Sequence, residues 1–299
     1  VEAKLASDAE RTLPESNLGA YAADVGWLRG AVAKLRPNAT GEIFLTDLVA
    51  FAVAEKKRVA AYRTNDADEG RGVNTRVDLA AAEDALRRRI RERHMLAGVT
   101  FRDPASSLVD ADVVLAPDVV IERGSVLEGK TRVGAGTRIG PYSIVRESTI
   151  GERCRVEASV VEGATLEDDV RVGPFSHLRP GAYLERGVEM GNYGEVKNAR
   201  LGAETKMHHF SYVGDAAVGK RVNIGAGTIT LNYDGVRKHR TEIGDDAFIG
   251  SDTLLRAPVK VGKNAATGAG AVVTKDVPDD HIGIGMPARM RKRKPPAKD

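Results

Sequence analysis

The sequence has almost no cysteine and lacks any long apolar run. Its one cysteine, Cys154, excludes an intramolecular disulfide, which is compatible with a reducing compartment. No apolar stretch approaches the ~18 residues that a transmembrane helix needs, and the first residues do not have the pattern of a signal peptide. We therefore expect a cytoplasmic protein that does not insert into a membrane.

An excess of charge of either sign is also lacking. Lysine and arginine total 45 and aspartate and glutamate total 42, so the net charge of +3 gives no electrostatic case for binding nucleic acid or an anionic membrane. The basic residues that gather near the end of the chain are predicted to form a solvated tail. They are Arg289, Arg291, Lys292, Arg293 and Lys294.

What the sequence does have is a period of six. From about Val113 to Val277 an aliphatic residue returns at every sixth position, often followed by glycine, as in Val133-Gly-Ala-Gly-Thr-Arg and Ile139-Gly. This period fits neither an α-helix nor a free two-faced sheet, and it is the signature of a parallel β-helix. Three hexads would close one coil, with the aliphatic residues stacked inside, each worth roughly 1.5–3 kcal/mol on burial. Cys154 lies in this register, so we interpret it as a small coil residue and not as a nucleophile.

The residues before the repeat have a different pattern. Residues 1–76 read as mixed α/β, with helices expected at Val25–Leu35 and Phe44–Ala54 and a strand at Val59–Arg63. A long helix rich in Ala, Glu and Arg follows from Asp78 to Leu96.

Gly98 stands where a C-cap glycine would end that long helix. The sequence thus predicts an α/β remnant at 1–76, a linker helix at 77–97 and a β-helix domain at 98–299. The last part of that domain, Val277–Asp299, is predicted to be an irregular tail.

The repeat has one long interruption, between Thr230 and Ile243. Insertions in solenoids form loops on one face, and that face is often the binding face. We therefore expect a ligand beside this loop, which carries polar and charged side chains at Asn232, Tyr233, Arg237, Lys238 and His239.

Four segments of the repeat carry a specific resemblance. They are Gly173–Gly181, Asn192–Lys197, His209–Asp215 and Val222–Gly235, in this order. Together they resemble the acetyltransferase half of the bifunctional N-acetylglucosamine-1-phosphate uridylyltransferase/glucosamine-1-phosphate N-acetyltransferase family. The resemblance implies a left-handed parallel β-helix and a homotrimer that holds acetyl-CoA between neighbouring subunits.

The same resemblance assigns roles to residues of this chain. It implies that His209 is the proton acceptor and that Arg179, Lys197, Tyr212 and Asn223 bind the amino sugar phosphate. Lys238 matches a loop residue that reaches the active site. The positions that match acetyl-CoA contacts are Ala226, Asn232, Tyr233, Ser251 and Ala269.

The residue types suit acetyl transfer to a sugar amine. Such a reaction needs a base for the ammonium proton and cations for the phosphate. His209 is the best candidate for the base because histidine titrates near neutral pH, and Glu195, on a neighbouring coil, could hold its ring in the right tautomer. Arg179 and Lys197 recur about one coil apart and could hold a phosphate together.

The N-terminal segments resemble the last third of the family's uridylyltransferase domain. Glu2, Asn17 and Asn74 match its sugar-nucleotide positions, and Asn74 also matches a magnesium ligand. The family's glycine-rich loop, catalytic lysine and metal-binding aspartate precede the part present here. We therefore expect this chain to lack uridylyltransferase activity, with Mg²⁺ required only in a longer form.

A second departure from the family lies near the C-terminus. The family usually has an arginine for acetyl-CoA just before a late proline, where this chain has Gly285-Met286 before Pro287. Arg289 or the basic tail are candidates to replace it.

Other interpretations compete with these assignments. Arg179 and Lys197 could be solvated charges, Asn223 and Asn232 could be turn residues, and Gly134–Arg138, which resembles a nucleotide-binding loop, is assigned to a coil turn by its register.

Two other functions also remain open. In a β-helix carbonic anhydrase, His177, His208 or His209 would bind zinc across a subunit boundary. In a non-catalytic module, the coil would only assemble and regulate a nucleotidyltransferase. The function predicted ahead of these is acetyl transfer from acetyl-CoA to glucosamine-1-phosphate, for UDP-N-acetylglucosamine and the peptidoglycan and lipopolysaccharide of the cell envelope.

Overall fold

The computed structural model describes residues 6–12, 15, 17–38 and 41–292. The chain divides into two compact units, Val1–Leu86 and Arg87–Asp299. The division falls inside the long helix α4 (Arg76–Leu96), which the sequence analysis treated as a linker.

The first unit is built from short helices. They are α1 (Asp8–Arg11), α2 (Val25–Val32), α3 (Asp47–Ala54), the 3₁₀ helix η1 (Ala67–Gly70) and the start of α4. Helix α2 begins where Asp24 accepts a hydrogen bond from the backbone N–H of Trp27 at 2.8 Å, a typical N-cap. Helices α2 and α3 share a small core, which contains Ala31, Leu35 and Leu48.

The strand predicted at 59–63 is wrong. These residues are almost all exposed and have no regular secondary structure. A strand needs a neighbour that satisfies its backbone N–H and C=O groups, and no described residue of this unit belongs to a strand. The residue types at 59–63 favour a strand but do not specify a neighbour for it to pair with.

Helix α4 ends at a glycine, as the sequence predicts. Gly98 has a φ of +95°, the left-handed conformation that glycine adopts without strain. Near this end Ile90 is buried in the core of the second unit together with Val99 and Phe101. The last turns of the helix therefore cover the first coil of the repeat.

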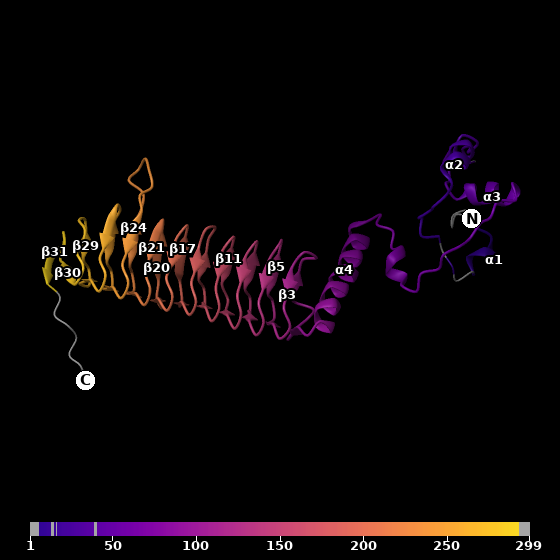
Figure 1. Cartoon of the computed structure of the whole chain (residues 1–299). Coiled ribbons are helices and arrows are strands. Elements are labelled where there is room, and N and C mark those ends of the chain that lie inside the picture. Colours follow the sequence, from indigo (N-terminus) through magenta and orange to yellow (C-terminus); the bar gives the residue numbers. More distant parts are fainter. Residues whose placement is uncertain (1–5, 13–14, 16, 39–40, 293–299) are drawn as a thin grey trace. The chain divides into compact units, whose positions relative to one another are not determined.

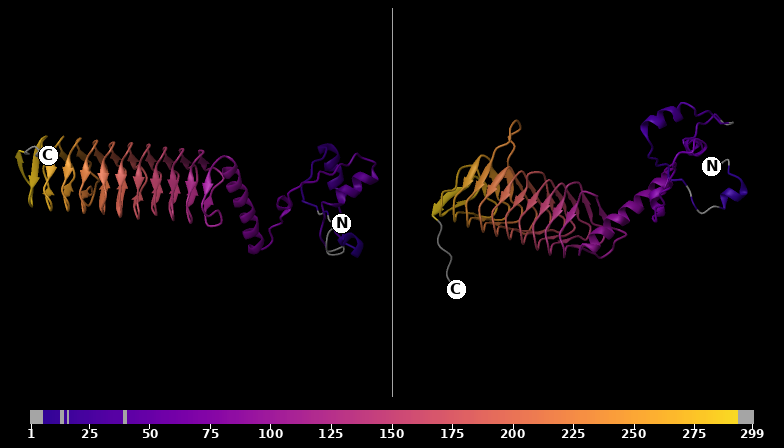
Figure 2. Two further views of the ribbon diagram at one scale, coloured as in Figure 1. Left: turned by 90° about the horizontal axis from the view of Figure 1, so that it is seen from below. Right: turned by 45° about the vertical axis from the view of Figure 1, so that its right-hand side comes forward.

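The second unit is a left-handed parallel β-helix, which confirms the predicted fold (Figures 1 and 2). Within the described residues its strands form three sheets of 12, 10 and 9 strands. Sheet A contains β1 (Thr100–Phe101), β4 (Val120–Ile121), β7 (Arg138–Ile139), β10 (Arg155–Val156), β13 (Arg171–Val172), β16 (Glu189–Met190), β19 (Lys206–Met207), β22 (Asn223–Ile224), β25 (Phe248–Ile249), β28 (Ala266–Thr267), β30 (His281–Ile284) and β31 (Arg289–Lys292).

The other two sheets complete each triangular coil. Sheet B contains β2 (Leu108–Val109), β5 (Val126–Glu128), β8 (Ile144–Arg146), β11 (Val160–Glu162), β14 (His177–Leu178), β17 (Gly194–Lys197), β20 (Ser211–Gly214), β23 (Ile229–Leu231), β26 (Leu254–Arg256) and β29 (Val272–Val273). Sheet C contains β3 (Val114–Leu115), β6 (Arg132–Val133), β9 (Thr149–Ile150), β12 (Thr165–Leu166), β15 (Tyr183–Leu184), β18 (Arg200–Leu201), β21 (Ala216–Val218), β24 (Thr241–Ile243) and β27 (Val259–Val261).

The aliphatic residues of the repeat stack inside the coils. Val156 pairs with Val172, 16 residues on, and Val172 pairs with Met190, 18 residues on, so one coil uses close to three hexads. The inner positions are fully buried, as at Leu178 and Leu184. Cys154 is also buried, and its burial raises the pKa of the thiol to about 11, in agreement with its assignment to the coil wall.

The glycines that follow the aliphatic residues allow the corners to stack closely. A Cβ atom added at Gly202 would lie 2.4 Å from the carbonyl carbon of Gly219 on the next coil. Buried hydroxyls satisfy backbone groups between coils, as where Thr137 donates to the carbonyl of Gly151 at 2.8 Å. The coil turn predicted at Gly134–Arg138 is confirmed, because residues 135–136 form a turn and Arg138 begins β7.

A loop and an extra strand interrupt the regular stack. The expected loop leaves the coils between β23 and β24 and stands out in orange beside β24 in Figure 1. The prediction of an irregular tail is wrong for residues 281–292, where β31 pairs antiparallel with β30. This pairing covers the edge of β30 that faces away from β28, and backbone groups at that edge are paired with those of β31.

Candidate functional site

Basic side chains of sheet B stand on the outer face of consecutive coils. Leu178 and Val196 point into the core, so the residues on either side of them point outward. Arg179 follows β14, and its backbone N–H donates to the carbonyl of Val196 at 2.9 Å. This bond places Arg179 beside Lys197, one coil on, as predicted from their spacing.

The charges of these residues affect one another. Nη1 of Arg179 donates to Oε1 of Glu195 at 2.8 Å, which raises the pKa of the guanidinium. The pKa of Lys197 is lowered, first by the positive charge of Arg179 and then by that of Lys238. Arg179, Lys197 and Lys238, here called the cation cluster, therefore gather positive charge that a phosphate group could neutralise.

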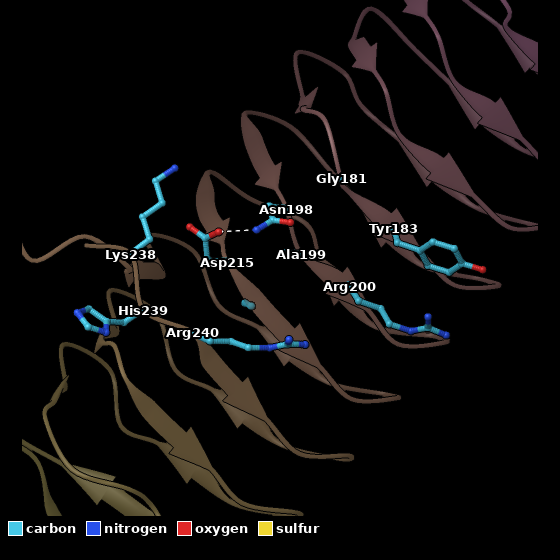
Figure 3. Close-up of a pocket in the computed structure, with 10 residues that line it drawn as sticks. Gly181, Tyr183, Asn198, Ala199, Arg200, Asp215, Lys238, His239 and Arg240 are labelled. Carbon is cyan, nitrogen blue, oxygen red and sulfur yellow. Dashed lines mark hydrogen bonds between the residues drawn. The ribbon is translucent and has the colours of Figure 1, made fainter. Parts of the chain in front are cut away.

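Lys238 reaches this region from the protruding loop. It lines a cavity of about 370 Å³ where sheets B and C meet, together with Asn198, Asp215, Arg200 and Arg240 (Figure 3). In Figure 3 the side chain of Lys238 points away from those of Arg200 and Arg240. The loop that the sequence marks as a place for a ligand therefore lines a cavity, and the ligand itself stays a prediction.

A second cavity, of about 220 Å³, contains several of the predicted residues at the corner between sheets A and B. His209 lies in the turn between β19 and β20, and Asn223 begins β22. The lining residues are His208, His209, Asn223, Ile224, Gly225, Ala226, Phe248 and Ser251. The structure thus brings the predicted base together with one predicted sugar-binding residue and two predicted acetyl-CoA positions.

Other predicted residues contact different partners. Glu195 accepts from Arg179, and among the described residues no hydrogen bond joins Glu195 to His209. Asn232 is nearly buried and donates to Oδ2 of Asp215 at 2.5 Å and to the hydroxyl of Tyr212 at 3.4 Å.

Tyr233 and Ala269 lie outside both cavities. The hydroxyl of Tyr233 donates to the carbonyl of Gly235 within the loop, and Ala269 is exposed in the turn after β28. One chain by itself therefore does not assemble the whole predicted set into a single pocket.

The competing interpretations can be weighed against these contacts. Arg179 is partly exposed and makes an ion pair with Glu195. Asn223 lies on a strand, and it does not have the left-handed backbone of a turn asparagine. His177 and His208 each pair with a glutamate at 3.0 Å, Glu162 and Glu189 respectively.

The described residues were also compared with what a metal site requires. They contain no group of three or more His, Cys, Asp and Glu side chains that could hold one. Asn17 donates to the hydroxyl of Tyr21, and the exposed Asn74 gives only its backbone N–H to Asp78. The described part of the N-terminal unit therefore does not fit a Mg²⁺ site, while Glu2 lies outside the described residues.

Near the C-terminus, Gly285 follows β30 with a φ of +94°. Arg289, a candidate for the family's missing arginine, is exposed on β31 opposite Ile284.

Sequence reasoning missed three residues beside the loop. Asp215, Asn198 and Arg240 line the larger cavity, and none of them was assigned a role. Asp215 ends the His209–Asp215 segment that carries part of the family resemblance, so its place in that segment was a usable signal. Arg240 lies within the interruption between Thr230 and Ile243, so its place there was a second usable signal, whereas the position of Asn198 beside the loop follows only from the stacking of the coils.

Comparison with known proteins adds to this geometry. Residues 240–275 match the family described as "Bacterial transferase hexapeptide (six repeats)". Over 291 residues, or 97% of this chain, the sequence is 49% identical to the "Bifunctional protein GlmU" of Alkalilimnicola ehrlichii. The chain is a relative of the bifunctional GlmU proteins. A protein of the same name from Streptococcus equi subsp. zooepidemicus is 46% identical over 98% of this chain.

The match to these GlmU proteins is partial on their side. This chain spans 63% and 64% of the lengths of the two relatives. Among solved structures, an Arabidopsis UDP-N-acetylglucosamine acyltransferase aligns with a TM-score of 0.53 and 15% identity, covering 63% of this chain and 73% of that one. At that identity the likeness shows the fold only. No described helix is both long enough and apolar enough to cross a membrane.

Proposed function

We propose that this chain transfers the acetyl group of acetyl-CoA to the amine of glucosamine-1-phosphate. The observation that carries the proposal is the pairing of two features on adjacent coils. In the cation cluster, Arg179 and Lys197 lie at sheet B and Lys238 reaches them from the loop, while the His209 cavity opens at the corner between sheets A and B. A base and a phosphate site are the two parts that this reaction requires, and relatives named bifunctional GlmU support the choice of substrate.

The chemistry follows from these positions. The sugar amine attacks the thioester carbonyl directly within a ternary complex, forming the C–N bond, and the C–S bond to CoA breaks. His209 takes the proton that the amine loses on attack, and CoA leaves as a thiolate that takes up a proton from the protonated His209 or from water to give the free thiol. Arg179, Lys197 and Lys238 hold the phosphate, with Tyr212 and Asn223 beside the sugar. Glu195, proposed from the sequence to orient His209, in this geometry orients Arg179.

Acetyl-CoA is a substrate and would lie along the His209 cavity, against Ala226 and Ser251. Asn232, Tyr233 and Ala269 lie outside that cavity in one chain, so a neighbouring subunit of a homotrimer would bring them to the donor. The proposal includes a cytoplasmic location and a role in making UDP-N-acetylglucosamine for the cell envelope. A longer form of the protein would add uridylyl transfer, which requires Mg²⁺.

The experiment is the release of free CoA thiol from acetyl-CoA, with glucosamine-1-phosphate or glucosamine-6-phosphate as acceptor. Release with the 1-phosphate alone is the expected result, since the cation cluster must read the phosphate position. Release with neither acceptor would contradict the proposal and favour a non-catalytic coil module. A stoichiometric content of zinc in the purified protein would favour the carbonic anhydrase alternative.

A further inference from the structure

Asp215 lies at the turn between β20 and β21, where sheets B and C meet. Its φ of +47° is in the left-handed region, which aspartate tolerates better than most residues. Its carboxylate accepts two amide hydrogen bonds, from Nδ2 of Asn198 to Oδ1 at 2.6 Å and from Nδ2 of Asn232 to Oδ2 at 2.5 Å. The carboxylate thus joins the preceding coil to the first residue of the protruding loop.

The backbone of Asp215 makes a second pair of contacts. Its N–H donates to the carbonyl of Lys197 at 3.1 Å, and its own carbonyl accepts from the N–H of Thr241 at 3.1 Å. Thr241 is the first residue of β24, where the loop rejoins the coil. Asp215 therefore contacts both ends of the loop and the strand that carries Lys197.

The loop itself is tied together internally. Asp234 accepts from the N–H groups of Val236 and Arg237 and pairs with His239 at 2.6 Å. The N–H of His239 donates to the carbonyl of Asn232 at 2.7 Å. Because these internal hydrogen bonds fix the shape of the loop, the contacts at its base determine the position of its side chains relative to the coils.

We propose that Asp215 is a positioning residue that holds this loop, and with it Lys238, beside Lys197 for the phosphate of the acceptor. The inference rests on the proposed function for the identity of that acceptor. The anchoring itself is a property of the chain and can be tested without any reaction.

The chemistry explains why a carboxylate is needed at this position. Both neighbours present an amide NH₂ group, and a carboxylate can accept from both of them. An asparagine at 215 would keep the size and the left-handed backbone but would turn its own NH₂ toward one of these donors. Asp215→Asn therefore removes one of the two contacts with little other change.

The test is a double-mutant cycle that combines Asp215→Asn with Lys238→Ala. If Asp215 acts through Lys238, Asp215→Asn raises the KM for glucosamine-1-phosphate roughly tenfold, as expected for losing a hydrogen bond to a charged group, and changes kcat less. In the Lys238→Ala background the same substitution adds little. Effects that multiply in the double variant, or a fall in kcat with unchanged KM, would overturn the proposal.

The matched control is Asp246→Asn. Asp246 also has a left-handed backbone, with a φ of +60°, and accepts two side-chain hydrogen bonds, in this case from Arg221 at 2.7 and 2.9 Å. Among the described residues, Asp246 forms no hydrogen bond or ion pair with the loop at 232–240. The control variant should leave the KM unchanged, and an equal rise in both variants would mean that any corner carboxylate matters in the same general way.

Limited trypsin digestion tests the anchoring separately from catalysis. The loop contains Arg237, Lys238 and Arg240, and a loop released at its base exposes these bonds more often. Faster cleavage in Asp215→Asn than in Asp246→Asn is expected. Asn198→Gly loses only the bond to the preceding coil and keeps the carboxylate of Asp215 and its bond to Asn232, so its cleavage rate should fall between them. Equal cleavage in all variants would refute the anchoring. Absence of thiol release from the unaltered chain would refute the proposed function alone, because the digestion result does not depend on it.

Discussion

Removal of the Arg179 side chain should weaken binding of the sugar phosphate by a predictable route. Arg179 pairs with Glu195 at 2.8 Å and lowers the pKa of Lys197 on the next coil. Arg179→Ala therefore has two effects: a donor to the phosphate is lost, and the carboxylate of Glu195 stands without its partner beside an anionic ligand. Loss of a hydrogen bond between charged groups predicts a rise in KM for glucosamine-1-phosphate of roughly 10- to 100-fold.

The pH dependence of this variant provides a second, sharper result. Lys197 binds phosphate only when protonated, and in the unaltered protein its pKa is below the usual value because of Arg179 and Lys238. The KM should therefore rise at high pH once Lys197 begins to lose its proton. With Arg179 removed, the pKa of Lys197 moves back up, so the alkaline rise in KM begins at a higher pH than in the unaltered protein.

The assay is thiol release measured over a range of acceptor concentrations and pH values. Arg153→Ala is the matched control, because Arg153 is also half-exposed and pairs with a carboxylate, Asp169, at 2.8 Å, and neither residue is assigned to the site. A KM that stays the same in Arg179→Ala, or an alkaline limb that moves to lower pH, would refute the reasoning.

Three further predictions concern the coil. Leu184→Ala should lower the free energy of unfolding by about 2–5 kcal/mol in urea titrations because the side chain is fully buried, whereas the exposed Val114→Ala should change it little; equal effects would contradict the stacked core. Gly202→Ala should lower the free energy of unfolding, because the new Cβ would lie 2.4 Å from the carbonyl carbon of Gly219. Gly30→Ala is the control, since a Cβ there meets open space. An unchanged free energy of unfolding in Gly202→Ala would show that the corners are less closely stacked. The thiol of Cys154 should not react with a disulfide reagent at pH 8 in the folded protein, because it is buried and has a pKa of about 11. It should react once the protein is unfolded in denaturant. Fast reaction in the folded protein would contradict the burial of Cys154 in the coil.

The repeat could be predicted because each hexad carries its own local signal. An aliphatic residue such as Val172 or Leu178 and a glycine such as Gly202 each satisfy a requirement that recurs in every coil. The strand expected at 59–63 had no such support, since pairing depends on a neighbour that the local pattern does not specify. Strand β31 shows the converse, because it forms by covering an edge that only the complete stack presents.

The site was predicted in parts for the same reason. The 18-residue separation of Arg179 and Lys197 predicted that they are neighbours on consecutive coils. The family resemblance assigned His209 and Asn223 to one site, and both line the same cavity. The partner of Glu195 could not be predicted, because residue spacing does not specify the direction of its side chain, which accepts a hydrogen bond from Arg179. The role of Asp215 depends on how the loop at 232–240 folds back, which requires contacts across three coils.

The central claim is tested most directly by the turnover of His209→Ala in the thiol-release assay, with His281→Ala as the control. We predict that kcat falls by about 10²–10⁴-fold in His209→Ala, the usual contribution of a general base, while acetyl-CoA affinity stays nearly the same and His281→Ala keeps its turnover. Unchanged turnover in His209→Ala would contradict the assignment of the base and, with it, the proposed mechanism.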